Sequence, residues 1–318
     1  MEETMKRILL AVIVVLNVSC SAYAETIGVS MSAFDDNFLT VLRNAIIAHS
    51  HSLPDVRVQI EDAQNDVSRQ QNQVQNFIAS GVSAIIVNPV DTDATEKISK
   101  LASDAKIPLV YVNRQPANVD RLPESQAFIA SDERVSGTLQ TQEVCRLLKE
   151  HGKGKSANVV VIMGLMSNQA SRQRTKDIHD VIETPECAFM KVVDEQTANW
   201  QRTEAINLMS NWLSAGIQFD AVIANADEMA IGAIQAMQSA GVPMKDYIVA
   251  GIDGSPDGIE LMKQGYLNVT VFQDAVGQGT AALDTALTLA HGNKTEQKIW
   301  VPFQLITPAN MNEFTGRN

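Results

Sequence analysis

Short apolar segments rich in β-branched residues recur along most of the chain, with helical segments between them. Apolar runs of this length, bounded by polar and turn-forming residues, are typical of buried strands. They predict strands at residues 26–29, 58–60, 84–87, 109–112, 128–130, 158–163, 189–193, 221–224, 248–250, 269–272 and 299–301. Such alternation of strands and helices favours parallel sheets covered by helices on both faces, because parallel strands need crossover connections.

The helical segments carry their own start and stop signals. In Val67–Ser80, Val74, Phe77 and Ile78 fall on one face, and Asp66 stands where it can cap the first turn. The same spacing predicts helices at residues 202–213, 228–240 and 275–290. The second of these ends at a glycine, Gly241, as helices often do.

The number of strands limits how they can be arranged. About ten strand–helix units exceed what a single twisted sheet usually holds. The sequence therefore predicts an α/β protein with two doubly wound parallel-sheet lobes. We expect one lobe to comprise residues 25–131 plus about 274–302, and the other 132–273 plus about 303–318. Because no low-complexity linker is present, short hinge strands should join them.

The N-terminus reads as a secretory signal peptide that ends at residue 24. Lys6 and Arg7 precede the apolar run 8–16, and Ala22-Tyr23-Ala24 supplies a small-residue cleavage site. We therefore expect an exported protein. A lipoprotein anchor at Cys20 is the alternative, but it is disfavoured because Asn17 occupies the position where such a signal has leucine.

Charge and cysteine content narrow the possible partners. The formal net charge of −12 argues against nucleic acid or an anionic membrane as a partner, because phosphates would be repelled.

Two cysteines, Cys145 and Cys187, remain after cleavage of the signal peptide. Export permits a disulfide between them, and two separate thiols are an equal alternative.

Polar and aromatic side chains follow the predicted strands, where the loops of parallel sheets converge. The residues singled out as ligand-binding candidates are Asp36, Phe38, Asn113, Arg114, Arg174, Trp200, Asp253 and Gln273.

These residue types suit a polyol. Arginine, carboxylate and amide groups can match neighbouring hydroxyls with two donors or acceptors at once. The aromatic rings of Phe38 and Trp200, expected from opposite lobes, offer flat faces for the C–H side of a sugar ring. Two acids, Asp36 and Asp253, offset two arginines, Arg114 and Arg174, which indicates a neutral ligand.

Several motifs resemble the ribose-binding branch of the periplasmic sugar-binding proteins. They cover the mature chain in the family's order: Asn88-Pro89-Val90-Asp91, Asn113-Arg114-Gln115, Ile129-Ala130-Ser131-Asp132, Arg172-Gln173-Arg174, Asn225-Ala226-Asp227-Glu228-Met229 and Gly251-Ile252-Asp253-Gly254. The resemblance implies a type I periplasmic binding protein, in which a ligand closes two hinged lobes and the closed form docks on a transporter permease.

The resemblance also implies roles for single residues. Phe38 matches the family's first-lobe aromatic, and Trp200 matches its second-lobe aromatic. Arg114 and Arg174 match its arginines, Asp253 the carboxylate after the glycine turn, and Gln273 the hinge glutamine.

Departures from the family's pattern put ribose in doubt. Asp36 stands in place of asparagine, Asn113 in place of aspartate and Ala226 in place of asparagine, while Leu39 replaces a second aromatic. A buried hydroxyl that loses its partner costs about 1–3 kcal/mol.

Further stretches resemble inositol-binding members of the family, which include binders of related amino-cyclitols. They are Tyr111-Val112-Asn113-Arg114, Gln196-Thr197-Ala198-Asn199-Trp200, Val271-Phe272-Gln273-Asp274 and Thr307-Pro308-Ala309-Asn310. We expect a monomeric component of an ABC importer that binds myo-inositol, without cofactor or metal. A ribose, hexose, amino-sugar or amino-cyclitol binder, or a ligand carrier for a chemoreceptor or sensor kinase, is the alternative.

Other functional classes find little support. The sequence contains no G-x-S-x-G, H-E-x-x-H or C-x-x-C pattern, so we do not expect an enzyme. A sugar-responsive repressor shares this fold, but it would need a DNA-binding headpiece in place of a signal peptide.

Overall fold

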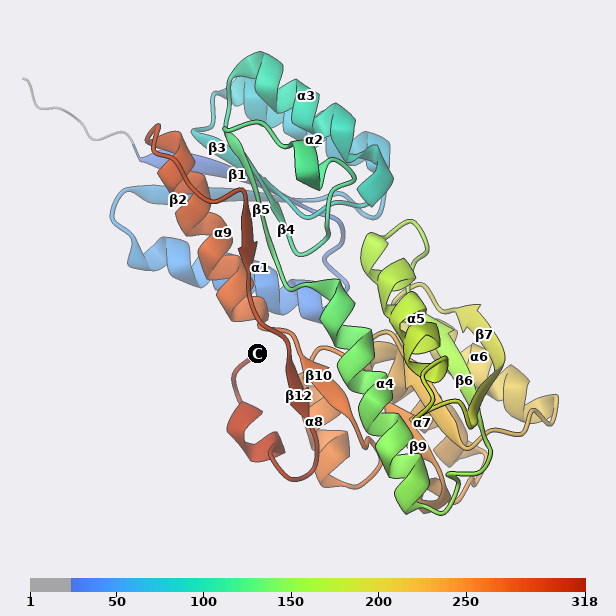
Figure 1. The fold of residues 1–318 in the computed structure, drawn as a ribbon. Helices are drawn as coiled ribbons and strands as arrows, with labels where there is room; N and C mark the ends of the chain where they lie inside the picture. The colour runs from blue at the N-terminus through green and yellow to red at the C-terminus, as the bar shows by residue number, and fades with distance from the viewer. Residues whose placement is uncertain (1–23) are drawn as a thin grey trace, which may run out of the picture.

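The computed structural model describes residues 24–318, which form two α/β lobes (Figure 1). Apart from Ala24, the predicted signal peptide and the alternative anchor at Cys20 lie outside the described residues. Within residues 24–318, no helix has both the length and the apolar character needed to cross a bilayer.

The strands of the described chain are short. They are β1 (Glu25–Met31), β2 (Val56–Asp62), β3 (Ala84–Val87), β4 (Leu109–Val112), β5 (Gln126–Ala130), β6 (Ala157–Met163), β7 (Met190–Thr197), β8 (Ala221–Ala224), β9 (Ile248–Ala250), β10 (Thr270–Phe272), β11 (Lys298–Trp300) and β12 (Gln304–Ile306).

The α-helices alternate with them. They are α1 (Asn37–Ser52), α2 (Val67–Ser80), α3 (Thr95–Ala105), α4 (Glu133–Glu150), α5 (Gln169–Ile182), α6 (Arg202–Ser214), α7 (Asp227–Ser239), α8 (Pro256–Lys263) and α9 (Ala275–Ala290). The predicted cap of α2 is present, since the carboxylate of Asp66 accepts a hydrogen bond from the Arg69 amide.

The first lobe is built on a six-stranded parallel sheet in the order β11-β5-β4-β3-β1-β2. Helices α1 and α9 pack on one face, and α2 and α3 pack on the other. Every residue of β3 and β4 is buried, which explains why their sequences are continuous apolar runs without alternation.

The second lobe has a parallel sheet in the order β7-β6-β8-β9. Helices α6, α7 and α8 cover one face, and α4 and α5 cover the other. Bridges from Ala250 to Val269 and from Asp253 to Phe272 place β10 beside β9. Strand β10 also pairs antiparallel with β12, which the sequence reading did not predict.

The chain passes between the lobes three times: from β5 to α4, from β10 to α9 and from β11 to β12. The α/β class with two parallel-sheet lobes is therefore as expected. The lobe boundaries given above stay a proposal, which this division of strands supports.

Cys145 of α4 and Cys187, in the loop before β7, form a disulfide. Their Cα atoms are 5.8 Å apart, and the residues are 42 positions apart in the sequence. Both are almost completely buried. Of the two alternatives left open by the sequence, the bridge is the one observed.

Replacing both cysteines by serine should lower the free energy of unfolding by about 2–4 kcal/mol, because the bridge restricts the unfolded chain. Urea denaturation of the oxidised wild type and of C145S/C187S measures the difference. A reductant should destabilise the wild type and leave the double variant unchanged. Equal stability of the two proteins under oxidising conditions would contradict the prediction.

Candidate ligand-binding site

A pocket lies between the lobes, with about 460 Å³ of space free of protein atoms, part of it continuous with solvent. All eight ligand-binding candidates line it. The lining residues are Asp36, Phe38, Leu39, Asn113, Arg114, Glu133, Ala170, Arg174, Trp200, Ala226, Glu228, Asp253 and Gln273. The fold thus brings together side chains that are distant in sequence and that follow the ends of different strands.

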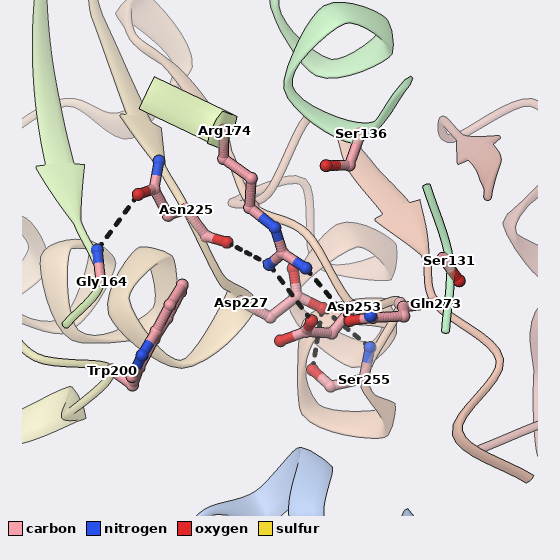
Figure 2. A network of polar contacts seen from close by, with 12 residues as sticks. Ser131, Ser136, Gly164, Arg174, Trp200, Asn225, Asp227, Asp253, Ser255 and Gln273 are labelled. Carbon is pink, nitrogen blue, oxygen red and sulfur yellow. Dashed lines mark hydrogen bonds and ion pairs between the residues drawn. The ribbon is translucent and has the colours of Figure 1, made fainter. Parts of the chain in front are cut away.

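Arg174 organises the second-lobe side of the pocket. Its Nε and Nη2 donate to the two carboxylate oxygens of Glu133, at 2.7 and 2.9 Å. Its Nη1 donates to the carbonyl oxygen of Asn225 at 2.7 Å, and Nη2 also reaches Oε1 of Gln273 at 3.2 Å (Figure 2). Most of its donors are therefore engaged within the protein, and Arg174 cannot offer its full fork to a ligand.

Asp253 stands beside this arginine with few partners. Its Oδ1 lies 3.8 Å from Nη1 of Arg174, and its side chain is buried. Burial raises the pKa of Asp253 well above its usual range; Arg174 works against the rise, and Asp227, Asp36 and Glu133 add to it. The carboxyl group is thus available to accept hydrogen bonds from a ligand.

Gln273 also retains unused hydrogen-bonding capacity. Its Nε2 is buried and has no hydrogen-bond partner among residues 24–318. A buried amide without a partner costs about 1–3 kcal/mol. An acceptor on a bound molecule would remove that cost.

On the first-lobe side of the pocket, the arginine forms fewer hydrogen bonds within the protein. Nη1 of Arg114 donates to the carbonyl oxygen of Pro89 at 3.0 Å, and this is the one hydrogen bond of its guanidinium among the described residues. Burial lowers the pKa of Arg114 to about 10, partly offset by Asp36, so the group is charged at neutral pH. Burial likewise raises the pKa of Asp36, while the amide of Leu39 and the charge of Arg114 oppose the rise.

Trp200 forms a wall of the pocket from the second lobe. Its indole lies against the backbone of Gly164, where a Cβ atom would come within 2.2 Å of the ring (Figure 2). The guanidinium carbon of Arg174 is 5.7 Å from the ring centroid, within range of a cation–π contact. Phe38 lines the pocket from the first lobe.

Three lining residues have left-handed backbone conformations. The φ angles are 66° at Asn113, 67° at Trp200 and 129° at Asp253. For a residue that is not glycine, such conformations cost about 1–3 kcal/mol and cluster at functional sites. Their coincidence in one pocket is independent support for a site here.

Two lining residues, Glu133 and Glu228, were not among the predicted site residues, and they add two carboxylates to the predicted charge balance. Arg174 is shared by two carboxylates, Glu133 at 2.7 Å and Asp253 at 3.8 Å. Glu228 pairs with Arg202, which lies outside the lining. With Arg202 counted beside the lining residues, four carboxylates face three guanidiniums, so one carboxylate is in excess. A helix-start glutamate is ordinarily exposed, so no sequence signal marked Glu133 as buried.

The profile of a known family covers most of the chain. The family described as "Periplasmic binding protein domain" matches residues 27–294. This chain belongs to the periplasmic binding protein family. The resemblance found in the sequence is thereby confirmed.

Curated relatives span nearly the full length of this family member. A putative rhizopine-binding protein of Rhizobium meliloti is 59% identical over 314 residues, covering 99% of this chain and 100% of the relative. The ribose import binding protein of Bacillus subtilis is 31% identical over 282 residues, covering 89% and 87%. Since the family and these relatives are binding proteins, this protein is not an enzyme.

Solved structures share the fold. An ABC transporter solute binding protein from Bacillus halodurans with bound myo-inositol is 40% identical, with a TM-score of 0.86 over 94% of this chain and 100% of that one. The Caulobacter myo-inositol binding protein, bound to myo-inositol, is 26% identical, with a TM-score of 0.82 over 92% and 96%.

Residues 24–318 contain no cluster of three or more acidic, histidine or cysteine side chains arranged to hold a metal ion.

Replacing Asp253 by asparagine should stabilise the protein, in the absence of added solute, by about 1–3 kcal/mol at pH 7, because it removes a poorly compensated buried charge. A carboxyl group with a raised pKa destabilises the native state when ionised. The penalty is present at neutral pH, shrinks as pH falls below the folded-state pKa, and is gone below the ordinary aspartate pKa of about 3.9, where both states are protonated. The gain should therefore shrink at lower pH.

Urea denaturation of wild type and D253N between pH 7 and pH 4 measures this difference. Asp104 is exposed on α3 and provides the control, D104N, for which we expect a change below about 0.5 kcal/mol. A loss of stability in D253N at pH 7 would show that the carboxylate is well compensated.

Proposed function

We propose that this protein is the periplasmic solute-binding component of an ABC importer, and that it captures a cyclitol, with myo-inositol as the first candidate. The main support for this proposal is the pocket between the lobes. It combines an aromatic wall at Trp200 with the Arg114 guanidinium, which makes one hydrogen bond within the described residues, and the buried carboxyl of Asp253. Hydroxyls around a six-membered ring can be donors to the carboxyl and acceptors for the guanidinium at the same time.

The relatives support this proposal. Two inositol-bound proteins share the fold over more than nine-tenths of this chain, and one of them is 40% identical. Ribose is less favoured although a ribose-binding relative is 31% identical. Ala226 lines the pocket where the ribose branch has an amide, and it leaves more room and one hydrogen bond fewer for a smaller sugar.

The proposed mechanism is closure around the solute. The eight candidate residues come from both lobes, so a molecule can contact all of them only when the lobes meet. Binding then shifts the equilibrium towards the closed form. In that form the monomer would dock on a membrane permease. Presentation to a chemoreceptor or sensor kinase would use the same closure.

A thermal-shift panel of polyols tests the ligand. Myo-inositol should raise the melting temperature of the wild type more than ribose or a hexose does. Trp200→Ala should remove most of the response, because truncating an aromatic side chain at the centre of a binding site costs about 2–4 kcal/mol. Exposed Trp300 provides a control, since Trp300→Ala should keep the response. Stabilisation by ribose and not by myo-inositol would overturn the assignment.

One observation favours a second candidate, an amino-cyclitol. The pocket holds four carboxylates, whereas only three guanidiniums, those of Arg114, Arg174 and Arg202, lie in or beside it. A ligand with an ammonium group would balance the additional carboxylate. A neutral cyclitol would instead require one carboxyl to take up a proton, and the raised pKa values of Asp36 and Asp253 make that possible.

Calorimetric titrations in two buffers of different ionisation enthalpy distinguish these ligands. Myo-inositol should bind with uptake of up to one proton, and its affinity should rise as pH falls from 8 to 6. An amino-deoxy-inositol should bind without uptake and more tightly at pH 8. If myo-inositol binds with no proton uptake and a flat pH profile, the charge argument fails.

A further inference from the structure

The two lobes contact each other at two edges of the pocket. At one edge, the amide of Asn37 on α1 reaches Oε1 of Glu228 on α7, at 2.7 Å. At the other, the segment after β3 meets the start of α5. We call this second contact the β3–α5 junction; it comprises residues 90–93 and 167–172.

The β3–α5 junction is dense in hydrogen bonds. The amide and hydroxyl of Thr92 both donate to the carbonyl oxygen of Ser167, at 3.2 and 3.1 Å. The amide of Gln169 donates back to Oγ1 of Thr92 at 3.1 Å. Arg172 pairs with Asp93 at 3.1 Å on the exposed side. Each of these contacts exists only when the lobes are together.

Asn168 occupies the centre of this junction. It is fully buried and holds the N-cap position of α5, with φ −101° and ψ 132°. Asparagine at this position ordinarily caps the helix, which is worth about 0.5–2 kcal/mol. Here its side chain makes no cap hydrogen bond.

The side chain of Asn168 instead bridges the two lobes. Its Nδ2 donates to the carbonyl oxygen of Val90 in the first lobe at 3.0 Å. Its Oδ1 accepts from the indole Nε1 of Trp200 in the second lobe at 2.9 Å. One carboxamide thus connects the aromatic wall of the pocket to the contact that holds the lobes together.

We infer that Asn168 is a positioning residue that couples the orientation of Trp200 to closure of the lobes. The inference rests on the proposed function only in taking Trp200 as a wall of the ligand site. A solute packed on the indole fixes the ring, and Nε1 then orients the carboxamide so that Nδ2 faces Val90. When the lobes part, the Val90 carbonyl leaves, and the side chain is free to cap α5.

The chemistry of the two hydrogen bonds gives a specific test. Asn168→Asp keeps the size of the side chain, the acceptor for Trp200 and a good helix cap. It replaces the donor to Val90 by a second oxygen, which repels the carbonyl. Closure should weaken while the fold is preserved. We expect the dissociation constant for myo-inositol to rise about tenfold, chiefly through faster dissociation, with no loss of thermal stability in the free protein.

A double-mutant cycle identifies the coupling itself. Trp200→Phe keeps an aromatic ring and removes the indole donor. If Asn168 acts through Trp200, N168D should weaken myo-inositol binding about tenfold in the wild type and less than threefold in W200F. Equal factors in both backgrounds would overturn the inference. Arg172→Gln is the matched control, because it removes a junction contact that does not touch Trp200, and its effect should be the same in both backgrounds.

Small-angle scattering without added polyol separates this inference from the proposed ligand. N168D should have a larger radius of gyration than the wild type, or a distribution shifted towards open lobes. If the wild type binds no myo-inositol, the ligand assignment fails. The coupling still stands in that case, provided that N168D opens the lobes and that this opening is smaller in the W200F background. If N168D changes neither scattering nor affinity, the coupling is wrong.

Discussion

The buried ion pair between Arg174 and Glu133 is the interaction on which the candidate site depends. Both side chains are about 95% buried, and each would be costly to leave in the interior alone. The pair joins α4 to α5 and also fixes the Asn225 carbonyl and Gln273. Such a pair does little for net stability, but removing one partner leaves an uncompensated charge at a cost of about 3–5 kcal/mol. Its role is to hold the second-lobe side of the pocket in one geometry before a ligand arrives.

The two sides of the pocket therefore differ in character. On the second-lobe side, the arginine is satisfied, and the free groups are the Asp253 carboxyl and the Gln273 amide. On the first-lobe side, Arg114 keeps most of its donors. A polyol between the lobes would meet the Arg114 donors and the Asp36 carboxyl on one side. On the other side it would meet the Asp253 carboxyl and the unpaired amide donor of Gln273. Selection among cyclitols would then depend on which hydroxyls face which lobe, because the donors and acceptors are placed differently on the two sides.

The sequence predicted most of this arrangement for identifiable physical reasons. Parallel strands buried on both faces must be apolar runs, so β3, β4 and β8 were found with their correct bounds. The convergence of strand ends then grouped all eight candidate residues in one pocket. Strand β12 was not predicted, because Gln304–Ile306 is only three residues long and partly exposed.

Tertiary relationships explain what the sequence could not provide. Burial of Glu133 depends on Arg174 approaching from another helix, and no local pattern encodes that approach. The left-handed backbone at Trp200 is held by neighbours as well, because Gly164 admits the ring and Asn168 accepts its N–H. Asn168 itself looks like an ordinary helix cap in the sequence. An asparagine side chain can form either a helix cap or a longer-range hydrogen bond, and the tertiary structure determines which one forms. The side chain of Asn168 bonds to the other lobe and does not cap α5. The missing helix cap at Asn168 is therefore informative about function. Its loss must be offset by another interaction, and the hydrogen bond to Val90 is available only when the lobes are closed.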